Sequence, residues 1–376
     1  MNKYLQECHK VYRNLLQNPC YYNKVKVILG NESCDLDSAI SALVYAYITF
    51  HENKQKGVRN CEVLPILNVS HEDLLLKTEV IFYLRLHAIS LDNVLTKVNK
   101  ENFNLIKLQK AGVLDLTLVD HQTLSPADQE LSSSVVEIID HRPVVPDLNT
   151  SNIDVTIEPV GSCCTLIAKK ILQRSPHLLT FQICHLLYGP ILLDTFNFSP
   201  EAGKTTDSDR QVISSLERKI SVDRNRLFQD LIYAKTQVVG LSESQILRKD
   251  MKIIEGIPVC GLPMLVEDFL KRPYVEEILL NFLKTRNHSS VMMMMGVKIN
   301  GDTVDKDLAV FSTQHIFSDK IVEALLNFDN PSLGLKEITD HKIKYLRLFS
   351  QSNIRMSRKQ ISPIIQKVET GIKESV

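Results

Sequence analysis

The sequence has no apolar run long enough to cross a membrane. Its longest near-continuous apolar stretches, such as residues 291–297, fall far short of the roughly 20 residues that a membrane helix needs. The first ten residues, MNKYLQECHK, also lack the apolar segment of a signal peptide. Both absences predict a cytoplasmic protein.

The sequence also lacks any C-x-x-C pair. Its eight cysteines lie inside apolar segments and do not frame loops. A zinc ribbon or a disulfide framework needs cysteines that are paired at characteristic spacings. We therefore expect the cysteines to be reduced and mostly buried.

An excess of charge of one sign and low-complexity segments are missing as well. Lys+Arg and Asp+Glu both number 44, so no surface that wraps nucleic acid is expected and any anion site must be local. With 44% hydrophobic and 23% charged residues, the composition is that of a folded globular protein. A chain of 376 residues exceeds what one hydrophobic core usually supports, which predicts two domains.

The first two-thirds of the chain alternates short β-branched runs with helical patterns. This alternation is typical of an α/β domain with a parallel sheet flanked by helices. The expected strands are residues 24–30, 61–69, 114–120 and 135–140. The expected helices are residues 38–47, 77–87 and 162–172.

A second, smaller α/β domain is predicted beyond the polar stretch that begins near residue 200. Its expected strands are residues 257–264, 290–299, 307–313 and 343–350, and its helical stretches are 265–285, 317–328 and 358–373. The run VMMMM is interpreted as a buried strand, because methionine fills irregular core space. The predicted boundaries are 1–212 for the first domain, 213–229 for a helical linker and 230–376 for the second domain.

Two aspartates follow the first predicted strand. In ILGNESCDLDSAISAL, Asp35 and Asp37 come just before a helix, and in a strand-to-helix turn both can point into one pocket. There they repel each other unless a cation lies between them. The alternative is that they are ordinary acids at the start of a helix.

The same pattern recurs at other apolar segments. One strand ends in Asp120-His121, another in Asp140-His141, and Asp194 closes the apolar run GPILLD. A charged group there is costly to desolvate unless it is paired or bound to metal. Oxygen ligands with one or two imidazoles suit Mg²⁺ or Mn²⁺ better than zinc. Two such ions about 3.5–4 Å apart, bridged by a carboxylate, would activate a water for attack on phosphorus.

The motifs that carry this pattern resemble the DHH phosphoesterase family, and most closely its prune and exopolyphosphatase branch. The matching pieces, spread over essentially the whole chain, are GNESCDLDS, LVDH, IDHRP, EPVGSC, ILLDTFN, GKTTDSD, LRKDMK and MSRKQISP. The resemblance implies a DHH-type catalytic domain followed by a smaller DHHA2-type substrate-binding domain.

The resemblance also implies roles for individual residues. Asp35, Asp37, Asp120 and Asp194 would hold two metal ions, with Asp120 as the bridge, and His141 would be a further ligand. Catalysis would then fall to Asp120 and His141, together with Arg142, which would face the substrate phosphate.

Three positions depart from the pattern of related proteins. Related pyrophosphatases have histidines where Asn31 and Arg142 stand here, and these departures match the exopolyphosphatase pattern and argue against plain pyrophosphatase activity. An arginine is always protonated, so Arg142 could bind phosphate but could not shuttle a proton. Gln122 replaces a histidine of some prune proteins, which leaves its effect on the rate open.

Further substrate contacts are expected in both domains. In the second domain the resemblance assigns Lys252, Arg358 and Lys359 to the phosphate chain, and the latter two open a helix whose N-terminus favours anions. In the first domain, Gly161 and Ser162 would offer backbone N–H groups to an anion or position the preceding strand. Lys204, Thr206 and Asp209 would contact phosphate or cap a helix.

The function that follows from the resemblance is hydrolysis of short-chain polyphosphates, in a cleft that brings the metal centre against basic residues of the second domain. Cleavage of cyclic nucleotides is the alternative activity. A different class of function, regulation of nucleoside diphosphate kinase by binding, is also implied by the resemblance to prune proteins. A nucleic-acid exonuclease is disfavoured by the neutral charge balance.

Overall fold

The computed structural model describes residues 1–98, 103–145, 151–285, 290–300 and 303–373 and divides the chain into two compact units. The first unit is Met1–Lys235 and the second is Thr236–Val376. Residues 213–229, which the sequence assigned to a linker, lie in and between helices α8 (Asp207–Glu217) and α9 (Arg224–Thr236) of the first unit.

A six-stranded sheet forms the centre of the first unit. Its strands lie in the order β3-β2-β1-β4-β5-β6, and every neighbouring pair is parallel. Their bounds are β1 Lys24–Leu29, β2 Cys61–Ser70, β3 Thr96–Val98, β4 Leu114–Val119, β5 Val135–Asp140 and β6 Asp154–Ile157. The four central strands are those that the sequence predicts, whereas it misses β3 and β6, which are short and lie at the edges.

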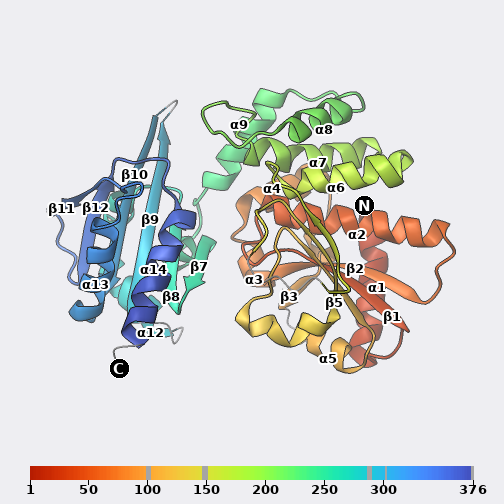
Figure 1. Cartoon of the computed structure of the whole chain (residues 1–376), viewed down its shortest axis with the longest axis horizontal. Helices are drawn as coiled ribbons and strands as arrows, with labels where there is room; N and C mark the ends of the chain where they lie inside the picture. Colours follow the sequence, from red (N-terminus) through yellow and green to blue (C-terminus); the bar gives the residue numbers. More distant parts are fainter. Residues whose placement is uncertain (99–102, 146–150, 286–289, 301–302, 374–376) are drawn as a thin grey trace. The chain divides into compact units, whose positions relative to one another are not determined.

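Helices cover the sheet on both sides, as an all-parallel sheet requires. Figure 1 shows α2, α6 and α7 on one side and α5 on the other. The bounds in this unit are α1 Asn2–Gln17, α2 Leu36–Gln55, α3 His71–Leu74, α4 Thr78–Leu86, α5 Leu105–Lys110, α6 Cys163–Arg174 and α7 Phe181–Asp194, with 3-10 helices at Leu91–Asn93, Pro126–Ser134 and Pro176–Leu178. Helix α2 is buried along most of its length, because it lies between the sheet and the pair α6 and α7.

The strand order places a topological switch point at β1. From β1 the chain continues through β2 to β3 on one side, while β4, β5 and β6 fill the other side. The crossovers therefore diverge between β1 and β4, beside the carboxyl ends of these two strands. Open α/β sheets bind their ligands at such points.

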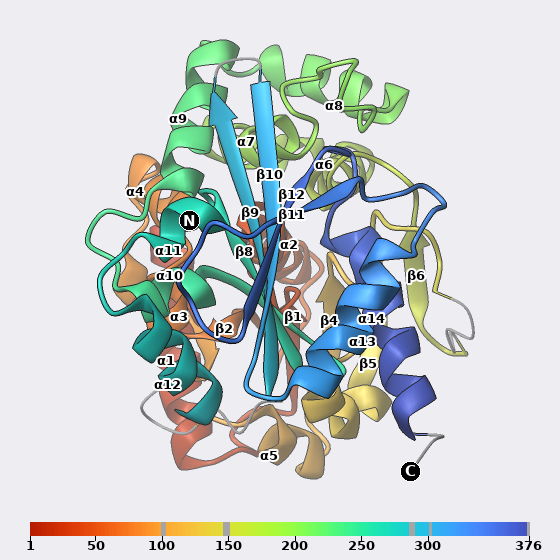
Figure 2. The same cartoon turned by 90° about the vertical axis from the view of Figure 1, so that its left-hand side faces the viewer.

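The second unit is a mixed sheet between two helical layers, and Figure 2 shows α13 and α14 side by side. The strand order is β11-β12-β10-β9-β8-β7, antiparallel except for the pair β8 and β9. The bounds are α10 Glu243–Lys249, β7 Asp250–Ile254, β8 Ile257–Leu262, α11 Val266–Leu270, α12 Val275–Thr285, β9 Val291–Asn300, β10 Thr303–Ser312, α13 His315–Leu326, β11 Leu335–Ile338, β12 Leu346–Gln351 and α14 Arg358–Lys373.

Strand β9 confirms the interpretation of the methionine run. Met292 and Met294 pack in one core with α10, α11 and α12, and Met293 packs in the other core with α13 and α14. Successive side chains of a strand point to opposite faces, so both faces of this strand are buried.

The state of the cysteines and the character of the helices can be compared with the predictions from the sequence. All eight cysteines are free thiols, six of them buried, with Cys61 half-buried and Cys20 exposed. Among the described residues, no helix combines the length and apolar character of a membrane span. The cytoplasmic location stays a prediction.

Candidate metal centre

The turn after β1 places Asp35 and Asp37 at the switch point. The Ser38 hydroxyl lies where a Cβ at Gly30 would be, 2.4 Å from its ideal position, and accepts a hydrogen bond of 2.7 Å from the N–H of Asn31. This close approach requires glycine. Asp35 then caps α2, because its Oδ1 accepts from the N–H of Ser38 at 3.0 Å.

Asp37 is held by the N-terminus of a second helix, α6. Its carboxylate accepts from the Ser162 hydroxyl at 2.7 Å, the Cys163 N–H at 2.6 Å and the Cys164 N–H at 2.9 Å. Two of these bonds go to Oδ1 and one to Oδ2, so Oδ2 retains a lone pair for a metal. The anion at this helix start is therefore a side chain of the protein.

Asp120 follows β4 directly and adopts a left-handed backbone conformation, with φ at 62°. It is 1% exposed, and its N–H donates to the carbonyl of Ile139 at 2.9 Å. Burial, followed by the negative charges of Asp35 and Asp37, raises the pKa of Asp120 to about 7. A backbone conformation that disfavours most side chains is thus kept at a buried acid, as occurs at functional sites.

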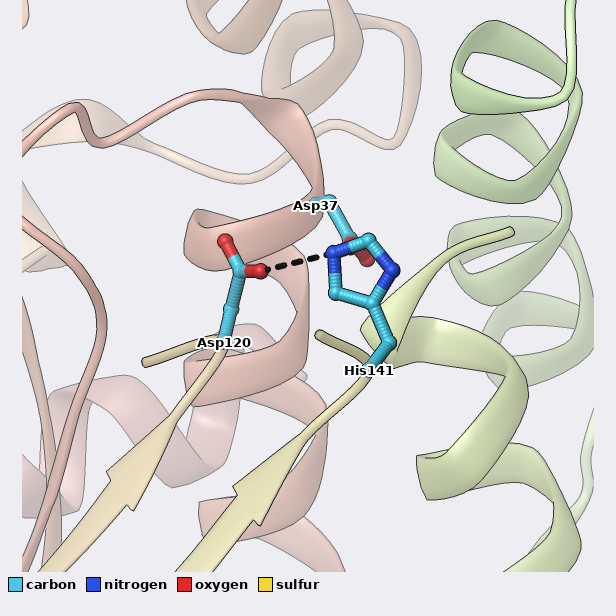
Figure 3. Close-up of side chains that lie close together, drawn as sticks. All are labelled: Asp37, Asp120 and His141. Carbon is cyan, nitrogen blue, oxygen red and sulfur yellow. Dashed lines mark ion pairs between the residues drawn. The ribbon is translucent and has the colours of Figure 1, made fainter. Parts of the chain in front are cut away.

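His141 follows β5 and faces Asp120, as Figure 3 shows. Its Nδ1 lies 2.9 Å from the carbonyl of Val160, which can only accept, so Nδ1 carries the hydrogen and Nε2 faces the site. Burial alone would lower the pKa of His141, but the hydrogen bond to Asp120 and the charge of Asp37 raise it to about 9. The Nε2 to Asp120 Oδ1 distance is 3.3 Å.

These three side chains form a group that could hold a metal ion. One ligand atom from each of Asp37, Asp120 and His141 lies within 4.8 Å of the others. Within the described part of the chain, the buried Oδ1 of Asp120 makes no well-formed hydrogen bond, and its ion-pair neighbours are His141 and Arg142. A carboxylate-rich site with one imidazole and no thiolate ligand fits a hard divalent cation.

Asp194, the last residue of α7, lies close enough to feel the same charges. Burial and the charges of Asp37 and Asp35 raise the pKa of Asp194 well above its usual range, and the positive charge of Lys235 on α9 opposes the shift. The group of three therefore has two further acids beside it, Asp35 and Asp194. All five predicted ligands belong to the first unit.

Arg142 places a positive charge between the strand ends. Its Nη1 lies 3.0 Å from Asp120 Oδ1 and 3.0 Å from Asp140 Oδ1, and it also donates to the Asp120 carbonyl. The side chain keeps 33% of its surface exposed. Asp140 thus orients Arg142, a role that the sequence did not assign although this acid also ends a strand.

Gln122 and Asn31, two of the departures from the family pattern, have structural partners. The Gln122 amide donates to Asp140 Oδ2 at 2.9 Å and accepts from the N–H of Val145 at 2.9 Å, which ties the two strand ends together. The Asn31 amide donates to the carbonyl and the carboxylate of Asp120. No local signal in the sequence indicates this second pairing, because the partners are 89 residues apart.

Gly161 and Ser162, which the sequence predicted as substrate contacts, are both buried. The Gly161 N–H donates to Asp209 Oδ2 at 2.9 Å, and the Ser162 hydroxyl is committed to Asp37. Asp209 also caps α8 through Thr206, whereas Lys204 lies over the ring of Phe196 at 4.6 Å. Contact of Gly161 and Ser162 with a substrate stays a prediction.

The predicted contacts of the second unit lie on β7 and α14. Lys252 is exposed on β7. Arg358, at the start of α14, donates to Asp250 Oδ1 at 2.7 Å and to the Asp250 carbonyl at 2.8 Å. The side chain of Lys359 lies outside the described residues. Contact of these residues with phosphate stays a prediction.

Models of two protein families match the chain. The N-terminal domain of the DHH family matches residues 26–191, and the DHHA2 domain matches residues 229–368. These matches agree with the predicted fold class of a DHH-type domain followed by a DHHA2-type domain.

Individual relatives extend the likeness over the full chain. A human protein described as exopolyphosphatase PRUNE1 is 33% identical over 383 residues, which cover all of this chain and 81% of that protein. A manganese-dependent inorganic pyrophosphatase of Methanothrix thermoacetophila is 25% identical over 230 residues, 60% of this chain and 64% of that protein.

Among solved structures, a Methanococcus jannaschii protein assigned to the family II inorganic pyrophosphatases superposes with a TM-score of 0.59. The match covers 92% of this chain and 100% of that one, at 20% sequence identity. At this identity the likeness shows a shared fold.

Proposed function

Because the chain belongs to the prune and exopolyphosphatase branch of the DHH phosphoesterase family, we propose that it hydrolyses the phosphoanhydride bonds of short-chain polyphosphates. The observation that carries this proposal is the group formed by Asp37, Asp120 and His141 at the switch point of a parallel sheet. An exopolyphosphatase among the full-length relatives supports the choice of substrate.

The residues present fit two divalent cations, Mn²⁺ or Mg²⁺, held by Asp35, Asp37, Asp120, His141 and Asp194. A manganese-dependent relative supports this choice of metal. When bound, such ions supply a water of lowered pKa and stabilise negative charge on the attacked phosphoryl group. Asp120, whose Oδ1 is buried without a well-formed hydrogen bond, is the proposed bridging ligand.

The other residues of the site hold the ligands or bind the substrate. The N-terminus of α6 fixes the Asp37 carboxylate, and Val160 fixes the tautomer of His141. The exposed part of Arg142 binds a phosphate of the substrate and orients it for attack, since a guanidinium offers several donors in one plane. We assign additional phosphate contacts to Gly161 and Ser162, and in the second unit to Lys252, Arg358 and Lys359.

Phosphate release from tripolyphosphate tests the proposal. With Mn²⁺ or Mg²⁺ present, we expect Asp120→Ala to lose nearly all turnover, by about a thousandfold, because the buried ligand is gone. Asp115→Ala on the same strand is the matched control. Asp115 is partly exposed and pairs with Lys24 at 2.8 Å, away from the strand end, so its loss should leave turnover within about twofold.

The same assay separates the rival activities. Equal rates in the native chain and in Asp120→Ala would contradict the metal-centred mechanism. If kcat/KM is higher for cyclic AMP than for tripolyphosphate, the proposed substrate becomes a cyclic nucleotide. The proposed metal site is unchanged by that result. Regulation of nucleoside diphosphate kinase by binding stays a prediction from the resemblance.

A further inference from the structure

Helix α7 carries Asp194 at its last position and contains a proline four residues earlier. Pro190 has no N–H, so the carbonyl of Leu186 loses the partner that it would have in a regular helix. The preceding residue is Gly189, which gives the helix the sequence Tyr-Gly-Pro in its second half. The helix is therefore weakened one turn before the acid.

A side chain from another helix enters α7 at this point. The hydroxyl of Tyr83, on α4, accepts from the N–H of Gly189 at 3.0 Å and donates to the carbonyl of His185. Residues 185 and 189 are i−4 and i partners, so these two groups bond each other in a regular helix. A tyrosine hydroxyl thus lies between them, beside the proline that removes the next hydrogen bond.

The close approach of the tyrosine requires the glycine. A Cβ at position 189 would lie 2.4 Å from Cζ and 2.5 Å from the hydroxyl oxygen of Tyr83. Tyr83 is 0% exposed, and its ring is packed against His87 with centroids 4.8 Å apart. The position of the hydroxyl is therefore set by a rigid, buried ring.

Downstream of the insertion, helical hydrogen bonding resumes. The Thr195 N–H donates to the carbonyl of Ile191 at 3.1 Å, as in a regular helix, and beyond the helix end the Asn197 N–H donates to the carbonyl of Leu192, five residues back, at 2.8 Å. The direction of the last turn, with Asp194, is therefore set by the backbone at Gly189 and Pro190. Helix bends of this kind arise at prolines and at groups inserted into the hydrogen-bond ladder.

We infer that Tyr83 is a positioning residue for the metal centre, since its hydroxyl sets the direction of the last turn of α7 and thereby places the Asp194 carboxylate. The inference rests on the proposed function, because it takes Asp194 as a ligand. Removal of the hydroxyl lets the Gly189 N–H bond the His185 carbonyl directly, which closes the ladder and turns Asp194 away from the other acids.

The test is the affinity of the metal-free chain for Mn²⁺, measured from free Mn²⁺ by electron paramagnetic resonance, together with thermal unfolding. We expect Tyr83→Phe and Asp194→Asn each to raise the Kd for Mn²⁺ by at least tenfold. Tyr188→Phe is the matched control, because Tyr188 lies on α7, is 1% exposed and donates to Glu217 at 2.7 Å. Tyr188→Phe should leave the Kd for Mn²⁺ within about threefold of that of the native chain, although it changes Tm about as much as Tyr83→Phe does.

A second variant gives a result that a purely structural role does not produce. Pro190→Ala restores an N–H to the helix, so Tm should rise or stay unchanged while the Kd for Mn²⁺ rises by several-fold. If Tyr83→Phe does not fold, Pro190→Ala still tests whether the interrupted part of α7 places the Asp194 carboxylate.

The outcomes separate the two proposals. If Asp194→Asn weakens Mn²⁺ binding but Tyr83→Phe behaves like Tyr188→Phe, or Pro190→Ala raises Tm at an unchanged Kd, the role of Tyr83 is refuted and the metal site remains. If Asp194→Asn leaves the Kd unchanged, both the ligand role of Asp194 and the role of Tyr83 fall.

Discussion

At the scale of single residues, protons and metal compete for the same atoms. In the metal-free protein, His141 Nε2 lies 3.3 Å from Asp120 Oδ1, and the pKa of His141 is raised to about 9. The pKa of Asp120 is raised to about 7 by burial and by the neighbouring acids. A cation must displace both protons, because only the deprotonated forms are ligands.

The first prediction is that Mn²⁺ affinity rises with pH. Between pH 7 and 8.5 His141 still holds its proton and Asp120 is partly protonated near pH 7, so a cation must displace at least about one proton and Kd falls by at least about tenfold per pH unit. Below pH 7 most Asp120 carboxyls also carry a proton that the cation must displace, so Kd depends more steeply on pH. Calorimetric titrations in buffers of different ionisation enthalpy count the protons.

His141→Asn is the control for this dependence. It removes the His141 proton that competes above pH 7, so the affinity should be lower and should depend less steeply on pH between 7 and 8.5. The same tenfold slope in this variant would show that another group supplies the proton.

At the scale of elements, the starts of three helices are joined around Asp37. Helix α2 carries this acid in its first turn, α6 binds it through backbone N–H groups, and α8 holds the start of α6 through Asp209. Asp209 is 0% exposed and accepts from Gly161, Thr165 and Thr206. The sequence suggested the cap of α8 as one option for Asp209 but offered no sign of its link to α6.

The second prediction concerns this acid. Asp209→Asn replaces one acceptor oxygen by a donor amide in a buried carboxylate that accepts from Gly161, Thr165 and Thr206, so the free energy of unfolding should fall by about 2–3 kcal/mol. Urea denaturation measures the loss. Asp207→Asn, an exposed acid at the first position of the same helix, should change it by less than about 0.5 kcal/mol. Equal losses in both variants would contradict the role of the buried carboxylate.

At the scale of the whole molecule, the predicted metal ligands and three of the predicted basic contacts lie in different units, whereas Arg142 lies in the same unit as the ligands. The five ligands belong to Met1–Lys235, whereas Lys252, Arg358 and Lys359 belong to Thr236–Val376. Among the described residues, one hydrophobic core belongs to the first unit and two belong to the second. Metal binding and substrate binding should therefore be separable.

The third prediction follows from this separation. A fragment of residues 1–235 should bind Mn²⁺ with a Kd within about threefold of the full chain, because every proposed ligand is present. Its kcat/KM for tripolyphosphate should fall by at least a hundredfold, because the basic residues of the second unit are missing. Turnover by the fragment at the rate of the full chain would exclude a role for the second unit in substrate binding.

The sequence by itself indicated the central strands, several of the helices and the acids that follow the strands, but not the helices α1 and α7. An apolar run that ends in an acid is a local pattern, and parallel strands bring their carboxyl ends to one edge, so Asp37, Asp120 and His141 could be predicted to meet. The short edge strands β3 and β6 escaped prediction, because three or four residues carry too little periodicity.

Only the tertiary structure decided which groups hold these residues in place. Ser162 donates to Asp37 across 125 positions, Asn31 to Asp120 across 89, and Tyr83 to the carbonyl of His185 across 102. Such contacts join segments whose own patterns require only a helix, a strand or a turn. Their partners are selected when the layers pack, because a buried polar group must find a hydrogen bond in the space that packing leaves.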